Sequence, residues 1–233
     1  MKIRNYIGFD RTLKLNWLNR VAQLSNQPTE NIKQELDLFL QEHISGKDAR
    51  RKANDALRRL WVSCDQNKLT KKARELFRSF DGSDRICLHF GMCMMASPFF
   101  RDVVQFGGML IKLQGEISAA QIRTRIYEKW GERSTLQYAI QRVFASLRDW
   151  GLLIAKSQGC YLPRTLTISN TEIIDWIVAS TVFSHLSRRI PLQELEVLPE
   201  LALFELESVR QVASQSQFFT IHREGSNQDY LTV

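Results

Sequence analysis

Residues 130–153, "WGERSTLQYAIQRVFASLRDWGLL", set the strictest limit on the fold because they combine a turn, one long helix and a stop. Apolar residues recur there at helical spacing, which predicts a helix that Ser134 caps and that runs to Trp150. Gly151 is a good C-terminal stop for this helix. The next segment, "LLIAKSQGCYLP", alternates around residues 157–159, which is typical of a short hairpin.

Two more helices are predicted ahead of this one. The first ends near Gln114, and Gly107 with Gly108 would let another helix approach it closely. The second follows "GEIS", in which we expect Ser118 to be the helix cap. Helix, helix, turn, helix and hairpin is the order of a winged helix-turn-helix, here over about residues 100–163.

We therefore expect a mostly α protein with three domains. An N-terminal helical domain would span residues 1–97, a winged helix-turn-helix domain residues 98–164, and a C-terminal winged-helix-like domain residues 165–233. The last of these would contain an amphipathic helix over residues 170–189, two more helical pieces, and two strands about "GSN" at 225–227.

The outer face of the 134–150 helix is predicted to carry side chains that suit base recognition, namely Gln137, Gln141 and Arg142. The major groove of DNA admits one helix, from which arginine pairs well with guanine and glutamine with adenine. Lys156 on the hairpin could lie along a phosphate backbone or a minor groove. Many winged helices bind only proteins, so a protein-binding module is an open alternative.

A second basic surface is predicted on the helix "GKDARRKANDALRRLWVS", residues 46–63. Four arginines on its outer side are expected to contact DNA phosphates: Arg50, Arg51, Arg58 and Arg59. Four guanidinium groups around one short helix exceed what solubility requires, and arginine neutralises phosphate charge on binding. The alternative is a solvated or protein-binding face.

Charge is divided unevenly along the chain, whose formal total is +7. Residues 1–82 hold 17 Lys/Arg against 10 Asp/Glu, a net of +7, and residues 83–164 hold 11 against 6, a net of +5. Residues 165–233 hold 4 against 9, a net of −5. This asymmetry indicates a polyanion partner for the first two thirds and a protein contact for the acidic last third. A solvated basic surface without a ligand is the alternative.

The sequence contains no catalytic motif: there is no Walker A loop, GxGxxG, HExxH or GxSxG, and the four histidines are scattered. The four cysteines form no CxxC pair. We therefore predict no enzyme activity, no catalytic residue, no metal site and no cofactor. Because no apolar run approaches the ~20 residues that span a bilayer, and the first residues lack a signal-peptide pattern, we expect a cytoplasmic protein without membrane contact.

Three segments carry a resemblance to a known family: "KDARRKANDALRRLW", "FFRDVV" and "RSTLQYAIQRVFASLRDWGLL". Their order distantly resembles the small BrxA-type accessory proteins of bacterial BREX phage-defence operons, over about residues 30–155. Members of that family are non-enzymatic and associate with DNA, so the resemblance implies a DNA-binding accessory subunit of a defence system.

The expected function is double-stranded DNA binding within a bacterial anti-phage assembly. Other defence-system proteins would bind through the acidic last third, and the chain itself could form a homo-oligomer. Two alternatives stay open: a winged-helix transcriptional regulator, and a scaffold subunit whose winged helices bind only proteins.

Overall fold

The computed structural model describes residues 7–64, 67–224 and 228–233. These residues are mostly helical, as predicted, with small sheets in the second half of the chain. The first part of the chain forms α1 Leu15–Leu24, α2 Thr29–Gln41, α3 Lys47–Trp61, α4 Lys68–Ser79 and α5 Gly82–Ala96.

The middle of the chain, which we call the central unit (residues 98–164), ends in a small three-stranded sheet. Its elements are α6 Pro98–Gln114, β1 Ile117–Ser118, α7 Ala119–Trp130, α8 Ser134–Asp149, β2 Leu153–Ser157 and β3 Cys160–Pro163. Strand β3 pairs antiparallel with both β1 and β2, so the strand order is β1-β3-β2.

The C-terminal unit (residues 165–233) contains a second three-stranded sheet and a parallel pair of short strands. Its elements are β4 Leu166–Ile168, α9 Thr171–Ser184, β5 Arg189–Pro191, the 3-10 helices η1 Leu192–Val197 and η2 Pro199–Leu201, β6 Phe204–Leu206, α10 Val209–Ser214, β7 Thr220–Glu224 and β8 Gln228–Thr232. Strand β8 pairs antiparallel with β5 and β7, giving the order β5-β8-β7.

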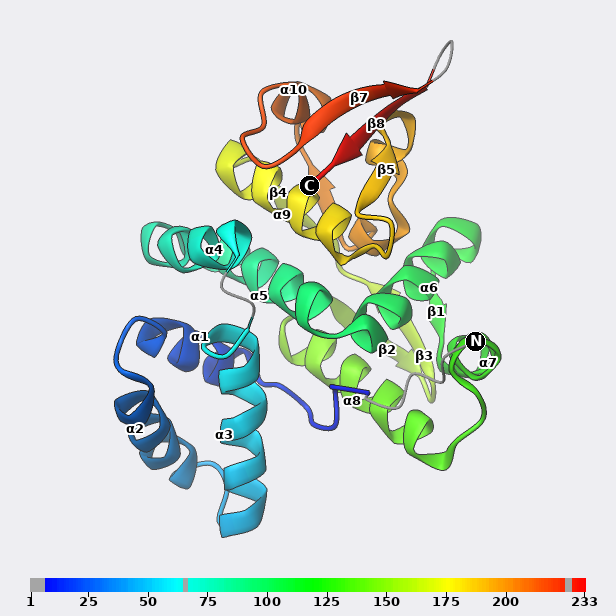
Figure 1. The fold of residues 1–233 in the computed structure, drawn as a ribbon. Coiled ribbons are helices and arrows are strands. Elements are labelled where there is room, and N and C mark those ends of the chain that lie inside the picture. Colours follow the sequence, from blue (N-terminus) through cyan, green and yellow to red (C-terminus); the bar gives the residue numbers. More distant parts are fainter. Residues whose placement is uncertain (1–6, 65–66, 225–227) are drawn as a thin grey trace.

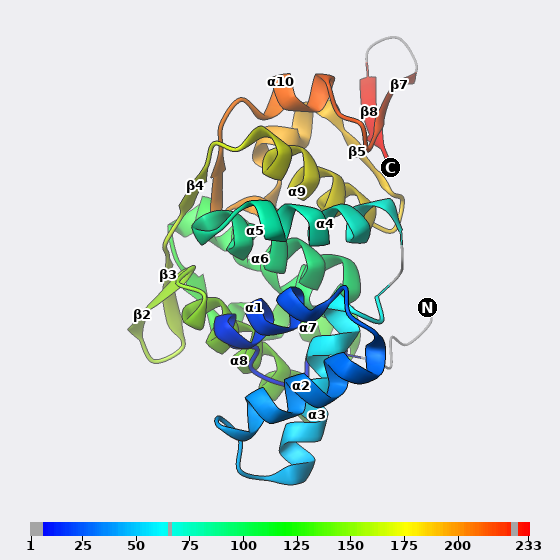
Figure 2. The same cartoon turned by 90° about the vertical axis from the view of Figure 1, so that its left-hand side faces the viewer.

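Helices α4, α5 and α6 form a layer across the middle of the molecule, with the C-terminal unit on one side and α1, α2, α3, α7 and α8 on the opposite side (Figures 1 and 2). A side chain at Gly91 of α5 would meet the Trp176 ring of α9 at 2.5 Å, so only glycine allows this close packing. The Trp176 indole N–H also donates to the Leu69 carbonyl at the start of α4, at 2.8 Å. One continuous hydrophobic core therefore runs across both predicted domain boundaries.

The glycine pair in α6 forms the second close contact between units. A Cβ at Gly108 would lie 1.7 Å from the carbonyl oxygen of Pro199, which begins η2. A Cβ at Gly107 would lie 3.3 Å from the flexible Ile117 side chain. The predicted close approach therefore occurs at Gly108, where the partner is a 3-10 helix of the C-terminal unit.

Local helix signals were correct at two positions and wrong at a third. Ser118 caps α7 by accepting from the Gln121 N–H, and Gly151 follows α8 with φ +76°. Ser134, however, is the first residue of α8, and Arg133 occupies the cap position without a side-chain cap bond. The serine lies one position too late to cap the helix.

The C-terminal unit departs most from the sequence expectations. Helix α9, predicted to be amphipathic, is buried from Ile173 to Val182 except at Asp175, because α5 and α4 cover one side and α10 and the sheet another. The predicted helical piece over residues 191–206 divides into two 3-10 helices and strand β6. Strands β7 and β8 are confirmed, and the turn at 225–227 lies outside the described residues.

Candidate nucleic-acid interface

The solvent-exposed side of α8 carries a polar stripe formed by Gln137, Gln141 and Arg148. These positions are four and seven residues apart, which places them on one helical face. None of the three side chains has a hydrogen bond or an ion pair within the described residues. The opposite face is apolar and fully buried, as residues such as Val143 and Phe144 show. The stripe is thus held outward by a rigid core and is available to a partner.

The β2–β3 hairpin is fixed beside this helix by two contacts. The rings of Phe144 in α8 and Tyr161 in β3 lie 4.9 Å apart between centroids, and the Ala119 N–H at the start of α7 donates to the Gly159 carbonyl at 2.8 Å. Lys156 is exposed on β2, with its Nζ 2.5 Å from Glu116 Oε2. This carboxylate raises the pKa of Lys156 and partly neutralises its charge.

Residues 10–15 cross one flank of α8. The Arg142 guanidinium donates to the Asp10 carbonyl, the Leu13 N–H donates to Ser146 Oγ at 2.8 Å, and the Trp150 indole N–H donates to the Leu13 carbonyl at 2.8 Å. Arg142 is half-buried as a result. The expectation that Arg142 faces outward beside Gln141 is corrected, because its guanidinium is engaged by a main-chain carbonyl of the N-terminal segment.

Asp149 in the last turn of α8 makes a contact that pattern analysis missed. Its Oδ2 accepts the N–H of Leu15, the first residue of α1, at 2.7 Å. Helix N-termini carry unsatisfied N–H groups and partial positive charge, which a carboxylate stabilises. The sequence held a signal for this role, since an acid in the last turn opposes the dipole of its own helix. Asp149 therefore joins the N-terminal helices to α8.

The predicted phosphate contacts on α3 already have acidic partners. Arg50 Nε lies 3.0 Å from Asp37, and a terminal nitrogen of Arg51 lies 2.7 Å from Asp48. The four arginines therefore do not form a continuous surface of unpaired positive charge. Arg58 also faces a carboxylate, that of Asp55 at 2.7 Å.

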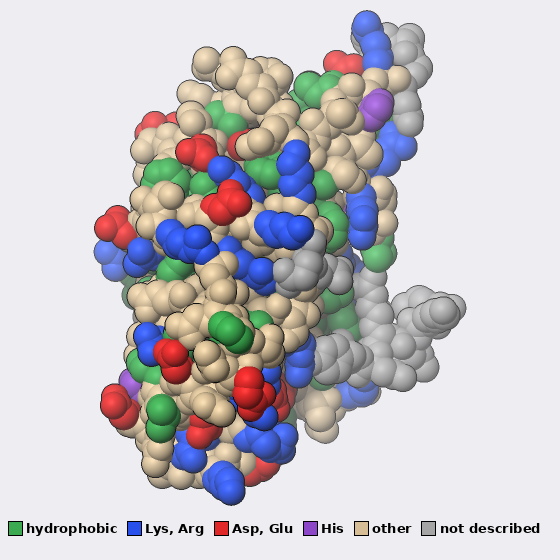
Figure 3. Space-filling model, turned by 60° about the vertical axis from the view of Figure 1, so that its left-hand side comes forward, with side chains coloured by type: hydrophobic (Ala, Val, Ile, Leu, Met, Phe, Trp, Pro, Cys, Tyr) green, Lys and Arg blue, Asp and Glu red, His purple; other side chains and the backbone are tan. Residues whose placement is uncertain are grey.

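These ion pairs leave α3 with mixed charge. Hydrogen bonds from Lys52 and Arg51 lower the pKa of Asp48 to about 2, so it stays ionised at neutral pH. Arg59 is exposed. Acidic and basic side chains intermingle at the end of the molecule that α2 and α3 form (Figure 3). Helix α3 packs on α1, α2 and α5 and contributes to a different part of the structure from α8.

Helix α4 also presents basic side chains, and these lie in the middle of the face in Figure 3. Lys71 and Arg78 are exposed and two helical turns apart, and neither has an ion pair within the described residues. Lys72 pairs with Glu172 at 2.9 Å, and Arg74 donates to the Trp61 carbonyl. Lys71 and Arg78 are therefore the two basic side chains of α4 that are exposed to solvent with neither a hydrogen bond nor an ion pair in the described residues.

Potential metal ligands do not cluster in the described residues. No group of three or more His, Cys, Asp or Glu side chains there could hold a metal ion. His89 and the nearby Cys87 and Cys93 are buried in α5, and burial with the Arg85 charge lowers the pKa of His89 to about 3. Across the same described part, no helix has both the length and the apolar character to cross a membrane.

Comparison of the chain with protein-family models, with curated proteins and with solved structures finds no match in any of the three.

Proposed function

We propose that the central unit is a winged helix-turn-helix and that the protein is a non-enzymatic, double-stranded DNA-binding subunit. The observation that carries this proposal is the unpaired stripe of Gln137, Gln141 and Arg148 beside a hairpin with an exposed lysine. A major groove admits one helix, and glutamine and arginine are the side chains that read adenine and guanine there.

The order of elements in the central unit supports the same proposal. A helix, a short strand, two helices and a hairpin follow one another, with strand order β1-β3-β2. In such a unit α8 would lie in the major groove and the hairpin would lie against the adjacent backbone. Arg148 would then take the place that Arg142 had in the sequence expectation, because Arg148 is exposed in line with Gln137 and Gln141.

For the C-terminal unit we propose contact with proteins rather than DNA. Its exposed acids, among them Glu194, Glu205 and Glu207, would repel phosphate. The resemblance of residues 30–155 to BrxA-type proteins makes other components of an anti-phage assembly, in a bacterial cytoplasm, the proposed partners. A homo-oligomer is compatible with the same surface.

A second candidate function is protein binding by the central unit itself, as in a scaffold subunit. Ile154 and Leu162 are cross-strand partners on the hairpin and are 52% and 38% exposed. Adjacent exposed apolar side chains favour a protein contact over a phosphate contact. The experiment below separates these two functions.

The test measures fluorescence anisotropy of several labelled duplexes with the folded double variant Gln141→Ala/Arg148→Ala. We expect affinity to fall by about 1–3 kcal/mol, about 5- to 150-fold, on some sequences only. The control is Lys33→Ala/Gln34→Ala on α2, which removes one charge and one carboxamide from another exposed helix. A uniform fall would indicate phosphate contact alone. Unchanged affinity on every duplex would reject DNA reading and favour the scaffold.

We propose only a secondary phosphate contact for α3, because Arg50, Arg51 and Arg58 already face carboxylates. Changing these three and Arg59 to glutamine should shift the slope of log affinity against log salt by clearly less than about 3.6, which is four times the value of about 0.9 for one phosphate contact. A shift of about 3.6 would mean that all four arginines contact DNA phosphates.

A further inference from the structure

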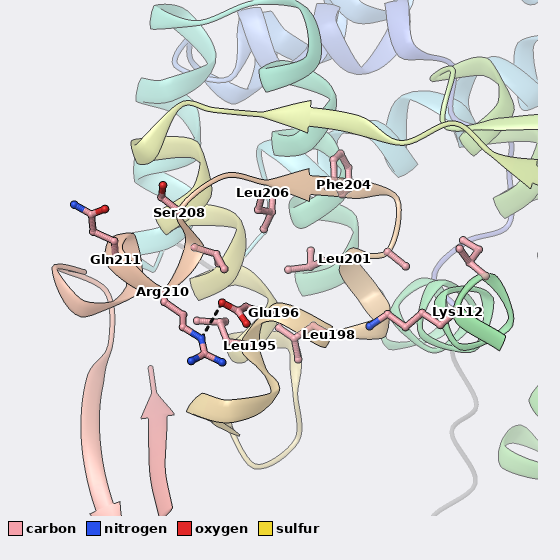
Figure 4. A pocket seen from close by; sticks show the side chains of 13 residues that line it. Lys112, Leu195, Glu196, Leu198, Leu201, Phe204, Leu206, Ser208, Arg210 and Gln211 are labelled. Carbon is pink, nitrogen blue, oxygen red and sulfur yellow. Dashed lines mark ion pairs between the residues drawn. The ribbon is translucent and has the colours of Figure 1, made fainter. Parts of the chain in front are cut away.

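A pocket of about 620 Å³ lies between the last turn of α6 and residues 195–211 of the C-terminal unit. The apolar lining residues include Leu195, Leu198, Leu201, Phe204 and Leu206. Figure 4 shows Leu198, Leu201 and Leu206 between strand β6 and the 3-10 helices, whereas Phe204 points to the other side of β6. Pockets that bind small molecules have volumes of about 300–1,000 Å³ and mostly apolar walls with a few polar groups. The volume of this pocket lies in that range, and eight of its thirteen lining residues are apolar.

Two cationic side chains reach the pocket from opposite elements, Lys112 from α6 and Arg210 from α10 (Figure 4). The Lys112 ammonium donates to the main-chain carbonyl of Val197, and partial burial lowers its pKa although Glu200 acts in the opposite direction. Arg210 Nε lies 2.8 Å from Glu196 Oε1. The Lys112 amine donates to a neutral carbonyl, so an anion would be a stronger partner.

The remaining polar side chains at the rim can donate or accept hydrogen bonds. Ser208 and Gln211 line the pocket and are exposed, and neither side chain has a hydrogen bond within the described residues. Ser208 also has a left-handed backbone, with φ +51°, immediately before α10. Lys112 and Arg210 are the only cations among the described residues that line the pocket, and Glu196 is the only carboxylate there.

The pocket is built into a rigid joint. Gly108, one turn before Lys112, contacts the Pro199 carbonyl so closely that no side chain fits between them. Lys112 is thereby fixed against the mouth of the pocket, which the neighbouring Leu198 and Leu201 line. Preorganised groups of this kind lose less entropy when a ligand binds.

We propose that this pocket binds a small amphipathic anion, a carboxylate with an apolar chain, whose chain fills the leucine-lined interior and whose carboxylate pairs with Lys112. Arg210 is already paired with Glu196, so the Lys112 ammonium matches the charge of the head group, and the apolar walls match the chain. The proposal is independent of DNA binding, since none of its residues belongs to the α8 stripe.

Isothermal titration of the full chain with octanoate tests the proposal, with 1-octanol as the uncharged probe. A ligand of this size should bind with a Kd of about 0.1–1 mM, and octanol should bind at least about tenfold more weakly. Lys112→Met should weaken octanoate about 10- to 100-fold, whereas the control Lys71→Met on α4 should not. Equal binding of octanol, or an unchanged Kd in Lys112→Met, would overturn the proposal.

Two further measurements locate the ligand. Ala202→Phe fills the pocket without changing charge and should abolish octanoate binding in a variant whose circular dichroism is unchanged. If that variant fails to fold, acetylation of the native chain decides: octanoate should protect Lys112, and not Lys71, from an amine-reactive reagent. Equal acetylation of Lys112 with and without octanoate would show that the pocket does not hold it.

Discussion

The central unit and the C-terminal unit share one strand order but differ in the helix before the hairpin. In both, the last strand of the hairpin lies between the other two strands, as β1-β3-β2 and β5-β8-β7. Helix α8 has 16 residues and a polar exposed face, whereas α10 has 6 residues and buries Val209 and Ala213 against its neighbours. The two units therefore share a strand topology and are distinguished by the length and the exposed polar face of one helix.

Among the described residues, each of the two units also buries one acidic side chain. In the central unit, Asp102 is buried where Arg101, Lys129 and the Trp130 indole meet it. In the C-terminal unit, Glu200 is buried against Gln105 and His185 and is no part of the acidic surface that the sequence suggested. Charge counted along a chain overstates surface charge wherever the fold buries an acid.

The largest expected effect tests what holds α8 and the hairpin together. Phe144→Ala should lower the free energy of unfolding by about 3–5 kcal/mol, because it leaves a cavity beside Tyr161. The midpoint of urea unfolding measures the loss. Tyr138→Ala, at a position 60% exposed on the same helix, should change stability by less than about 0.5 kcal/mol. Similar losses in the two variants would contradict the orientation of α8.

A second test concerns the joint between the units. Gly108→Ala should destabilise by about 1–3 kcal/mol or more, because its methyl group would collide with the Pro199 backbone. Gly107→Ala is the matched control: its neighbour is a flexible Ile117 side chain, and alanine favours a helix over glycine by about 1 kcal/mol. If thermal unfolding shows both variants to be equally stable, the two units do not meet at η2.

The core shared by both units supplies a pH test through His89. Its Nε2 lies 2.9 Å from Asn19 Oδ1, and burial lowers its pKa from 6.5 to about 3. Below pH 6.5 His89 is therefore protonated in the unfolded chain but stays neutral in the folded chain. The free energy of unfolding keeps its full value above pH 6.5 and falls as the pH is lowered toward 3. At pH 5 this difference in protonation should have lowered the free energy of unfolding by about 2 kcal/mol.

Urea unfolding of His89→Gln between pH 7 and 5 checks this prediction. The glutamine amide can still donate to Asn19, and it does not titrate. The free energy of unfolding of the variant should therefore fall less between pH 7 and pH 5 than that of the native chain. An identical pH profile in the native chain and the variant would mean that His89 is accessible to protons in the fold.

The smallest effect concerns the acidic face of the C-terminal unit. Changing Glu194, Glu205 and Glu207 to glutamine should raise DNA affinity by no more than about 1 kcal/mol, about fivefold, since exposed charges are well screened. Anisotropy at two salt concentrations measures the gain. A loss of affinity would show that this face supports DNA binding. Deleting the unit would not test the point, because Trp176 and its neighbours cover α5.

Signals that act within a few residues predicted much of the fold. The apolar spacing of α8, the Ser118 cap, the Gly151 stop and the hairpin that follows depend on neighbours in the chain, so their pattern is legible in one sequence. The outward position of Gln137 and Gln141 follows from the same helical period.

Contacts between distant segments followed from no such pattern. The Arg142 guanidinium is half-buried because it donates to the Asp10 carbonyl, 132 residues away in the sequence. The need for glycine at position 108 is explained only by its close contact with the Pro199 backbone. Glu200 is buried because η2 packs on α6, where Gln105 donates a hydrogen bond to it. Periodicity determines which face of a helix is apolar, but the neighbour that covers a polar flank depends on how the whole chain packs, and only the tertiary structure decides it.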